Sequence, residues 1–181
     1  LITNQLDGQK LDYSAVLSEI NSQVFRLGRV LSPQFGIGST LTFVHVIGVK
    51  LHLGHVGDSC ALRLRARALE QLTTDHTIET ELRERAARGE SIGLLMENRN
   101  ALTRCIGQPP PLEPDYQTHT VLPHDRYLLC SDGVSRFITH DEIKEILGKA
   151  ESPEVVARQL IDLANERGGL DNSTAVVLFF D

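Results

Sequence analysis

The chain has 181 residues, of which 41% are hydrophobic and 23% are charged, and these values are ordinary for one globular domain with a substantial core. Its net charge of −6, from 18 basic and 24 acidic residues, disfavours a nonspecific nucleic-acid-binding protein, which normally presents a basic face. No apolar run is long enough to span a bilayer, and no basic-then-apolar leader opens the sequence, so we expect no membrane segment.

The chain contains three cysteines, Cys60, Cys105 and Cys130. Their number is odd and their spacing shows no pairing, so we expect reduced, mostly buried thiols in a cytoplasmic protein. No cysteine or histidine pair has the spacing of zinc ligands, and we therefore expect no zinc site.

In chain order, residues 1–10 are polar and turn-like around Asp7-Gly8, which we interpret as a loop. Asp12 is expected to cap a helix that Gly28 and Ser32-Pro33 end. Alternating apolar residues then predict a β-hairpin, with strands over 40–49 and 51–53 and a turn at residues 48–50, followed by another strand over 61–64.

The charged segment 78–89 predicts an exposed helix, and 89–100 is expected to be a mobile loop or flap. Residues 109–114, rich in proline, predict a rigid extended connector before an edge strand at 116–121. Two helices are expected to begin at Thr139 and Ser152, the second stopped by Gly168-Gly169. Without repeats or long linkers, the pattern indicates a single α+β domain over residues 1–181.

Three aspartates lie at the ends of predicted strands. Asp132 ends the apolar run 127–130 and precedes Gly133, Asp58 follows the strand of the hairpin, and Asp171 precedes the apolar run 175–180. A carboxylate in such a position is costly to desolvate unless a cation or hydrogen bonds compensate it. If the strands are neighbours, the acids converge, and oxygen-only ligation suits magnesium, manganese or calcium. The alternative is a separate turn-forming role for each aspartate.

The three aspartates lie in short motifs that follow one another in a fixed order. These motifs are Gly57-Asp58-Ser59, Leu128-Leu129-Cys130-Ser131-Asp132-Gly133 and Asp171-Asn172-Ser173-Thr174. The connecting segments are Gly36-Ile37-Gly38-Ser39-Thr40-Leu41, Gln71-Leu72-Thr73-Thr74-Asp75-His76-Thr77 and Leu102-Thr103-Arg104-Cys105-Ile106-Gly107. The motifs resemble the later motifs of the metal-dependent PP2C (PPM) family of protein serine/threonine phosphatases, and the connecting segments are similar to those of the same family. The resemblance extends from about Leu11 to the end of the chain. It implies a four-layer α/β/β/α sandwich of two antiparallel sheets flanked by helices.

The resemblance also implies hydrolysis of phosphoserine and phosphothreonine in proteins by attack of a metal-bound water, without a phosphoenzyme. Two core Mn²⁺ or Mg²⁺ ions are implied, with Asp132 and Asp171 as ligands of the second. Asp58 together with Asp132 would bind a third, more weakly held ion. The implied partners are a phosphoprotein substrate and an opposing serine/threonine kinase.

Four further residues would support these ligands. By the resemblance, Asn172 orients Asp171 or its loop, and Gly133 lets the chain pass close to the metals. Gly57 and Ser59 flank Asp58 in its motif.

The first half of the family pattern is not recognisable in this sequence. The phosphate-binding arginine, the acidic residue of the first strand and the metal-bridging Asp-Gly loop all lack counterparts. We therefore expect an N-terminally truncated domain, which by itself cannot form the complete bimetal centre. Smaller departures are Cys60, where an arginine is usual, and Ser135-Arg136, where an aromatic-acid pair is common.

Other function classes stay open on this basis. One is a noncatalytic PP2C-like regulatory or partner-binding module, and another is a metal-binding hydrolase of small phosphoesters. Among the remaining polar residues, His76 is expected to be structural, whereas His52 and His55 either approach a metal or lie on an exposed sheet face. Arg104 is expected to hold the flap through a carboxylate or a backbone carbonyl.

Overall fold

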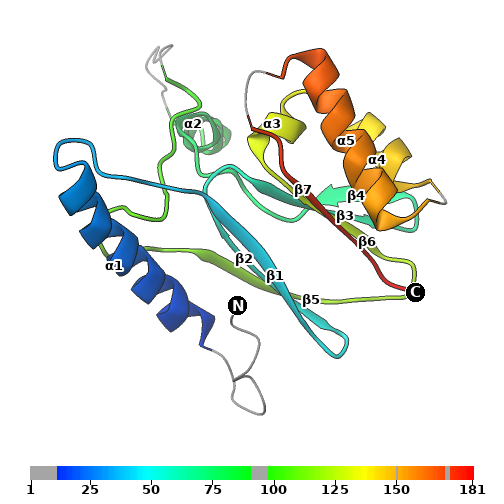
Figure 1. Cartoon of the computed structure of the whole chain (residues 1–181), viewed down its shortest axis with the longest axis horizontal. Coiled ribbons are helices and arrows are strands. Elements are labelled where there is room, and N and C mark those ends of the chain that lie inside the picture. Colours follow the sequence, from blue (N-terminus) through cyan, green and yellow to red (C-terminus); the bar gives the residue numbers. More distant parts are fainter. Residues whose placement is uncertain (1–11, 91–97, 150, 170–171) are drawn as a thin grey trace.

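The computed structural model describes residues 12–90, 98–149, 151–169 and 172–181. Within them, two antiparallel sheets lie face to face, with one helix outside the first sheet and two helices outside the second (Figure 1). This arrangement confirms the expected α+β sandwich of four layers. The loop at Asp7-Gly8, Asp171 and most of the expected flap fall outside the described residues.

The first sheet has the strand order β1-β2-β5. Its strands are β1 (Leu41–Ile47), β2 (Lys50–Val56) and β5 (Asp115–Thr120). The hairpin of β1 and β2 turns at Gly48, whose φ of +57° is a conformation that glycine adopts without strain. The predicted hairpin is thereby confirmed, and the edge strand predicted at 116–121 is β5, displaced by one residue.

The second sheet has the strand order β4-β3-β6-β7. Its strands are β3 (Cys60–Arg65), β4 (Ala68–Gln71), β6 (Arg126–Cys130) and β7 (Ala175–Phe179). Outside this sheet lie α4 (His140–Leu147) and α5 (Pro153–Arg167). Both helices begin where the sequence predicts, because Thr139 forms a capping box with Glu142 and Ser152 accepts a hydrogen bond from the Val155 N–H.

Helix α1 (Tyr13–Leu31) covers the outer face of the first sheet. Its Asp12 cap accepts a hydrogen bond from the Ala15 N–H, as the sequence predicts. The helix ends at Leu31 with Ser32 as its C-cap, which confirms the end predicted at Ser32-Pro33, whereas the prediction that Gly28 ends the helix is wrong. Gly28 is instead a packing position, because a Cβ there would lie 2.8 Å from the backbone nitrogen of Ile37.

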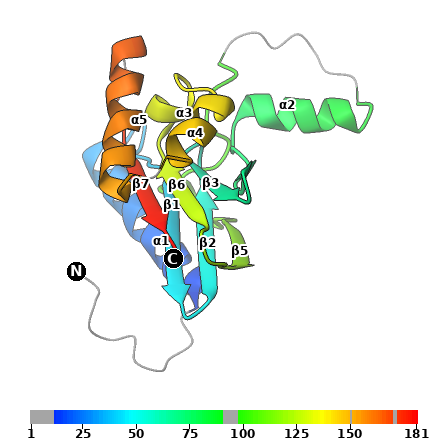
Figure 2. The same ribbon diagram turned by 90° about the vertical axis from the view of Figure 1, so that its right-hand side faces the viewer.

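Three hydrophobic clusters fill the spaces between the layers. One lies between the sheets and includes Leu51, Leu53 and Tyr127. A second joins the second sheet to α4 and α5, and a third lies under α1. Helix α2 (Ile78–Ala87) contributes no buried residue and projects away from the layers (Figure 2), as expected for a charged, exposed helix.

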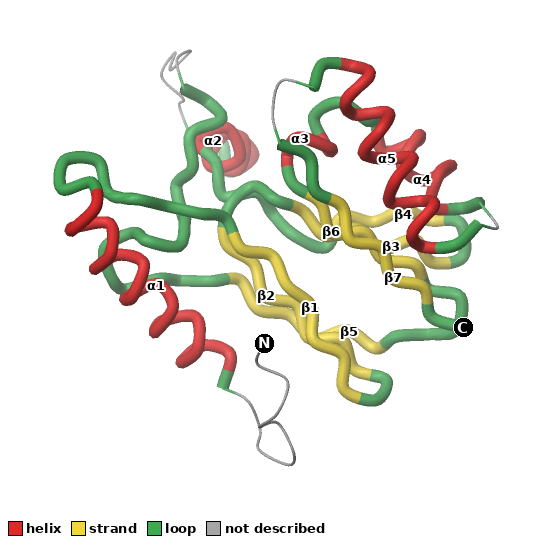
Figure 3. Tube along the Cα trace, in the orientation of Figure 1, coloured by secondary structure: helices red, strands yellow, loops and turns green. Residues whose placement is uncertain are grey.

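Pairing of β3 with β6 determines where the candidate site lies. The two strands are antiparallel with Cys60 opposite Cys130, so the start of β3 lies beside the end of β6. The corner that contains Asp58 therefore meets the short helix α3 (Asp132–Ser135), which follows β6. Figure 3 shows this helix and the loops around it at one end of the second sheet.

Candidate active site

Asp58 and Asp132 converge on one guanidinium group. The Nη2 atom of Arg136 lies 2.8 Å from an Asp132 carboxylate oxygen and 3.4 Å from an Asp58 carboxylate oxygen. The two carboxylates are 74 residues apart in sequence, and the β3–β6 pairing brings them together. Their side chains are mostly covered, with 14% exposure for Asp58 and 24% for Asp132, whereas that of Arg136 is 46% exposed. The site is thus a pair of neighbouring acids with a cation between them.

The Asp58 corner is held by its glycine neighbour. Gly57 has a φ of +113°, and a Cβ at this position would overlap the side chain of Thr40. The backbone N–H of Gly57 donates to the ring atom Nδ1 of His76 at 3.1 Å. The Gly57 carbonyl accepts a hydrogen bond from the backbone N–H of His76 at 2.8 Å. Ser59 shares a hydrogen bond of 2.8 Å with the Thr40 hydroxyl. These bonds orient the chain so that Asp58 faces Arg136.

The residues after Asp132 form the helical turn α3, where the sequence indicates only an Asp-Gly turn. Asn172 lies against this helix, because a Cβ on Gly133 would be 2.5 Å from the Asn172 carbonyl oxygen. The Ser131 hydroxyl donates to that oxygen at 3.2 Å, and the Ser173 hydroxyl donates to the Gly133 carbonyl at 3.0 Å. The 172–174 segment is therefore tied to the Asp132 loop at several points.

Asp75 is a third acid of the cluster, and the sequence motifs assign it no role. Burial, and then the negative charge of Asp58, raise the pKa of the Asp75 carboxyl above its ordinary value. Its carboxylate accepts a hydrogen bond of 3.1 Å from Gln71. The sequence could have pointed to Asp75 only through its position in the family-like segment 71–77. Its closeness to Asp58 arises in the folded chain.

Behind the cluster lies a buried pair of histidine rings, His55 and His76, with centroids 4.8 Å apart. Burial, reinforced by the neighbouring His76, lowers the pKa of His55 to about 4. Burial and the positive charge of Arg104 also lower the pKa of His76. His76 has a structural role, as expected. The sequence allowed His55 to lie on an exposed sheet face, and this is wrong, because its side chain is buried. Both rings are therefore neutral at physiological pH.

Arg104 has both kinds of partner that the sequence predicts. It donates to the Glu113 carbonyl and to the Asp115 carboxylate, each at 3.0 Å. The same carboxylate lies 3.3 Å from Nε2 of His76. Arg104 thereby links β5 to the histidine that supports the Asp58 corner.

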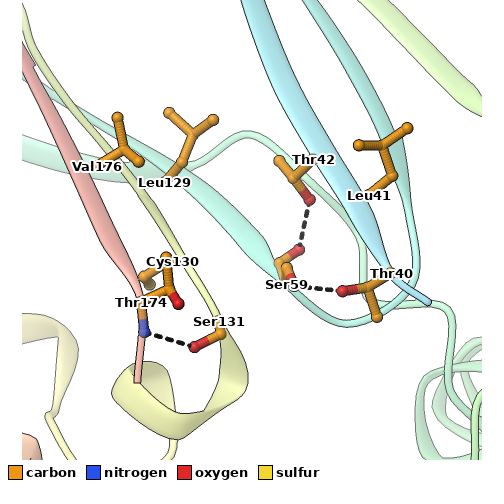
Figure 4. Close-up of a pocket in the computed structure, with 9 residues that line it drawn as sticks. All are labelled: Thr40, Leu41, Thr42, Ser59, Leu129, Cys130, Ser131, Thr174 and Val176. Carbon is orange, nitrogen blue, oxygen red and sulfur yellow. Dashed lines mark hydrogen bonds between the residues drawn. The ribbon is translucent and has the colours of Figure 1, made fainter. Parts of the chain in front are cut away.

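A cavity of about 290 Å³ lies beside the acids, between β1 and β7 (Figure 4). Hydroxyl groups gather on its walls, from Thr40, Thr42, Ser59, Ser131 and Thr174. In Figure 4, hydrogen bonds join Ser59 to both threonines of the first sheet and Ser131 to Thr174. Ser59 follows Asp58 and Ser131 precedes Asp132, so the cavity continues the acidic cluster.

The donor set of the cluster fits a hard divalent cation in its chemistry, since carboxylate oxygens are the ligands that magnesium and manganese prefer. Among the residues that the structure describes, no group of three His, Cys, Asp or Glu side chains is arranged to hold a metal ion. The described residues thus provide two close carboxylates and Asp75 near them.

Comparison with known proteins identifies the fold and its relatives. The sequence pattern of the family described as Protein phosphatase 2C matches residues 31–173, well over half of the chain. The chain belongs to the protein phosphatase 2C family.

Its relatives in this family include bacterial phosphatases. The chain is 30% identical to protein phosphatase PhpP of Streptococcus pneumoniae over 87% of its own length and 64% of that protein. The serine/threonine phosphatase structure from S. agalactiae superimposes with a TM-score of 0.83, at 28% identity over 93% of this chain and 69% of the other. The catalytic domain of phosphatase PstP, solved in complex with 2 manganese ions, has a TM-score of 0.72 at 34% identity, covering 93% and 68% of the two chains.

The chain spans about two thirds of the length of each of these three proteins. No helix within the described part of the chain is long and apolar enough to cross a membrane.

Proposed function

We propose that this chain is a protein serine/threonine phosphatase domain of the 2C family that hydrolyses phosphoserine and phosphothreonine with divalent metal ions. The observation that carries the proposal is the convergence of Asp58 and Asp132 at one point, because two gathered carboxylates supply the oxygen ligands that a divalent ion prefers, where Arg136 now provides the positive charge. The family membership supports the reaction class. On this proposal, residues 1–181 belong to a single domain of that family.

Asp132, with Asp171, would hold a core Mn²⁺ or Mg²⁺ ion, and Asp58 with Asp132 a third, weaker one. Asp75 lies within electrostatic range of these acids, since the charge of Asp58 contributes to the raised pKa of its carboxyl. When bound, such ions lower the pKa of a coordinated water and neutralise charge on phosphoryl oxygens. The manganese complex of the relative PstP supports the choice of metal.

The other site residues position these acids. Gly133 allows the Asn172 backbone to approach α3, and Ser131 and Ser173 hold it there by hydrogen bonds. Gly57 and Ser59 set the corner that presents Asp58. These contacts keep the backbone that carries the two acids in one place.

The proposed substrate is a phosphoprotein, and the proposed partner in signalling is a serine/threonine kinase of the same cell. Relatives named as serine/threonine phosphatases support the substrate class. A cytoplasmic location is proposed from the three free thiols, which a reducing compartment maintains.

The test is hydrolysis of a phosphothreonine peptide, with and without Mn²⁺, by the 181-residue chain and by a chain that also carries the first-half family motifs at its N-terminus. We expect Mn²⁺-dependent release of phosphate by the chain that carries those motifs. In that chain Asp132→Asn should lower the rate by about 100-fold or more, because the reaction depends on neutralising the charge of the phosphoryl oxygens in the transition state. Asp162→Asn, on the exposed side of α5, is the matched control and should retain the activity.

Three other results would change the assignment. Phosphopeptide binding without turnover in the presence of Mn²⁺ would identify a noncatalytic binding module. Hydrolysis of p-nitrophenyl phosphate with no action on the peptide would indicate a small-phosphoester hydrolase. Equal rates in wild type and Asp132→Asn would refute the proposed site.

A further inference from the structure

Two of the three cysteines face each other across neighbouring strands of the second sheet. Cys60 begins β3 and Cys130 ends β6, and they are directly opposed in the antiparallel ladder. Their Sγ atoms are 3.4 Å apart, and both residues are free thiols that are buried in the described structure. The proposed hydrolysis uses neither of them.

We propose that Cys60 and Cys130 form a dithiol that hydrogen peroxide oxidises to a disulfide across β3 and β6. Directly opposed residues of an antiparallel ladder have Cα atoms about 4.5–5.5 Å apart, which lies inside the range of about 4.4–6.8 Å found for disulfides. From the present 3.4 Å, the sulfur atoms must approach by about 1.4 Å to reach bonding distance. Side-chain rotation can supply this movement, so the strands can keep their pairing.

The reaction balances with peroxide as the oxidant. One Sγ attacks a peroxide oxygen, the O–O bond breaks, and a sulfenic acid and one water form. The second Sγ then attacks the sulfenic sulfur, the S–S bond forms, the S–O bond breaks, and a second water leaves. In total the two thiols lose two protons and two electrons, and one hydrogen peroxide becomes two waters.

The position of the two cysteines in the sheet determines how fast peroxide can oxidise them. The hydrogen bond between the sulfurs, together with burial, raises the pKa of Cys130, so its thiol is a slow nucleophile at neutral pH. The pair nevertheless lies where β3 begins and β6 ends, and strand ends open locally more easily than strand centres. We therefore expect slow but specific oxidation under sustained exposure to peroxide.

The crosslink would lie directly beneath the acidic cluster. Cys60 comes two residues after Asp58, and Cys130 comes two residues before Asp132. The inference depends only on the sulfur geometry and not on the phosphatase assignment, so either can fail without the other. A disulfide here would join the two strands that carry both acids.

The experiment exposes the native 181-residue chain to hydrogen peroxide at mildly alkaline pH, then unfolds it in an alkylating agent. Peptide mass spectrometry then shows which cysteines carry an alkyl group. Because the chain has three cysteines, the reduced chain should carry three alkyl groups. The oxidised chain should carry one, on Cys105. The digest should contain one linked peptide joining Cys60 to Cys130, and dithiothreitol should restore alkylation of both.

Variants and controls make the result specific. Cys105→Ser should form the same linked peptide, whereas Cys60→Ser should not form it. The measurement on the unsubstituted chain needs no variant, so a variant that fails to fold does not weaken it. Three alkyl groups after peroxide treatment, a disulfide that includes Cys105, or separate oxidation of Cys60 and Cys130 to sulfinic acids would each overturn the proposal.

Discussion

Replacing Gly133 by alanine tests how closely α3 must approach the 172–174 segment. The new Cβ would lie 2.5 Å from the Asn172 carbonyl oxygen and 3.2 Å from the Ser173 hydroxyl, so the segment has to move. Overpacking of this kind costs about 1–3 kcal/mol. Exchanging glycine for alanine in a helical conformation recovers about 0.5–1 kcal/mol. Taking the centre of each range, we expect a net loss of about 1 kcal/mol in the free energy of unfolding.

Such a loss corresponds to a fall in Tm of about 2–4 °C for a domain of this size. Differential scanning calorimetry would measure it, and isothermal titration with Mn²⁺ would show weaker binding, since the displaced segment leads back toward Asp171. Ser135→Ala, in the same short helix, is the matched control because it adds no atom. A Gly133→Ala protein as stable as the wild type, with the same Mn²⁺ affinity, would refute the close approach.

Three further predictions concern charged and titrating groups. Arg136→Ala should bind Mn²⁺ about threefold to thirtyfold more tightly by titration calorimetry, because two ion pairs, each contributing about 1 kcal/mol or less, no longer compete with the metal. The exposed control Arg158→Ala should leave the Mn²⁺ affinity unchanged, and equal effects of both substitutions would contradict the reasoning. Asp125→Ala should lower the urea-derived free energy of unfolding by about 2–4 kcal/mol, because Asp125 is buried and its loss leaves Arg65 without the carboxylate that it contacts at 2.5 and 2.7 Å. An effect below about 1 kcal/mol would show that this ion pair is not structural. Because the pKa of His55 falls to about 4 on folding, its stabilising contribution is present above the unfolded value of 6.5 and is lost as the pH falls toward 4. In urea unfolding at several pH values, His55→Gln should therefore show a flatter decline over this interval than the wild type, and identical slopes would refute the assignment.

Local chemistry makes much of the fold predictable. The hairpin of β1 and β2 follows from alternating apolar residues with a glycine at the turn. The starts of α1, α4 and α5 follow from the polar side chain that directly precedes each helix and accepts a hydrogen bond from a backbone N–H three residues on. Each of these signals acts over a short stretch of chain, so reading the sequence in order detects it. The exposed helix α2 is equally visible, because it lacks an apolar stripe.

Gly28 and α3 show where local signals fail. A glycine in a helix usually indicates an end, but Gly28 is internal because Ile37 packs against its backbone. The turn after Asp132 becomes helical where the 172–174 segment, far along the chain, supplies hydrogen bonds to it. In both cases the deciding partner lies outside the helix, nine residues on from Gly28 and 40 residues on from Gly133.

For the site, the amino-acid sequence alone shows the candidate acids, the glycine and serine residues beside them, and the family whose motifs they resemble. The folded chain was needed to show that Asp58 and Asp132 share Arg136, that Asp75 joins them, and that Cys60 faces Cys130. The difference arises from the register of β3 against β6. Residue spacing along a chain specifies strands, but which strand ends meet depends on pairing and packing across the whole domain.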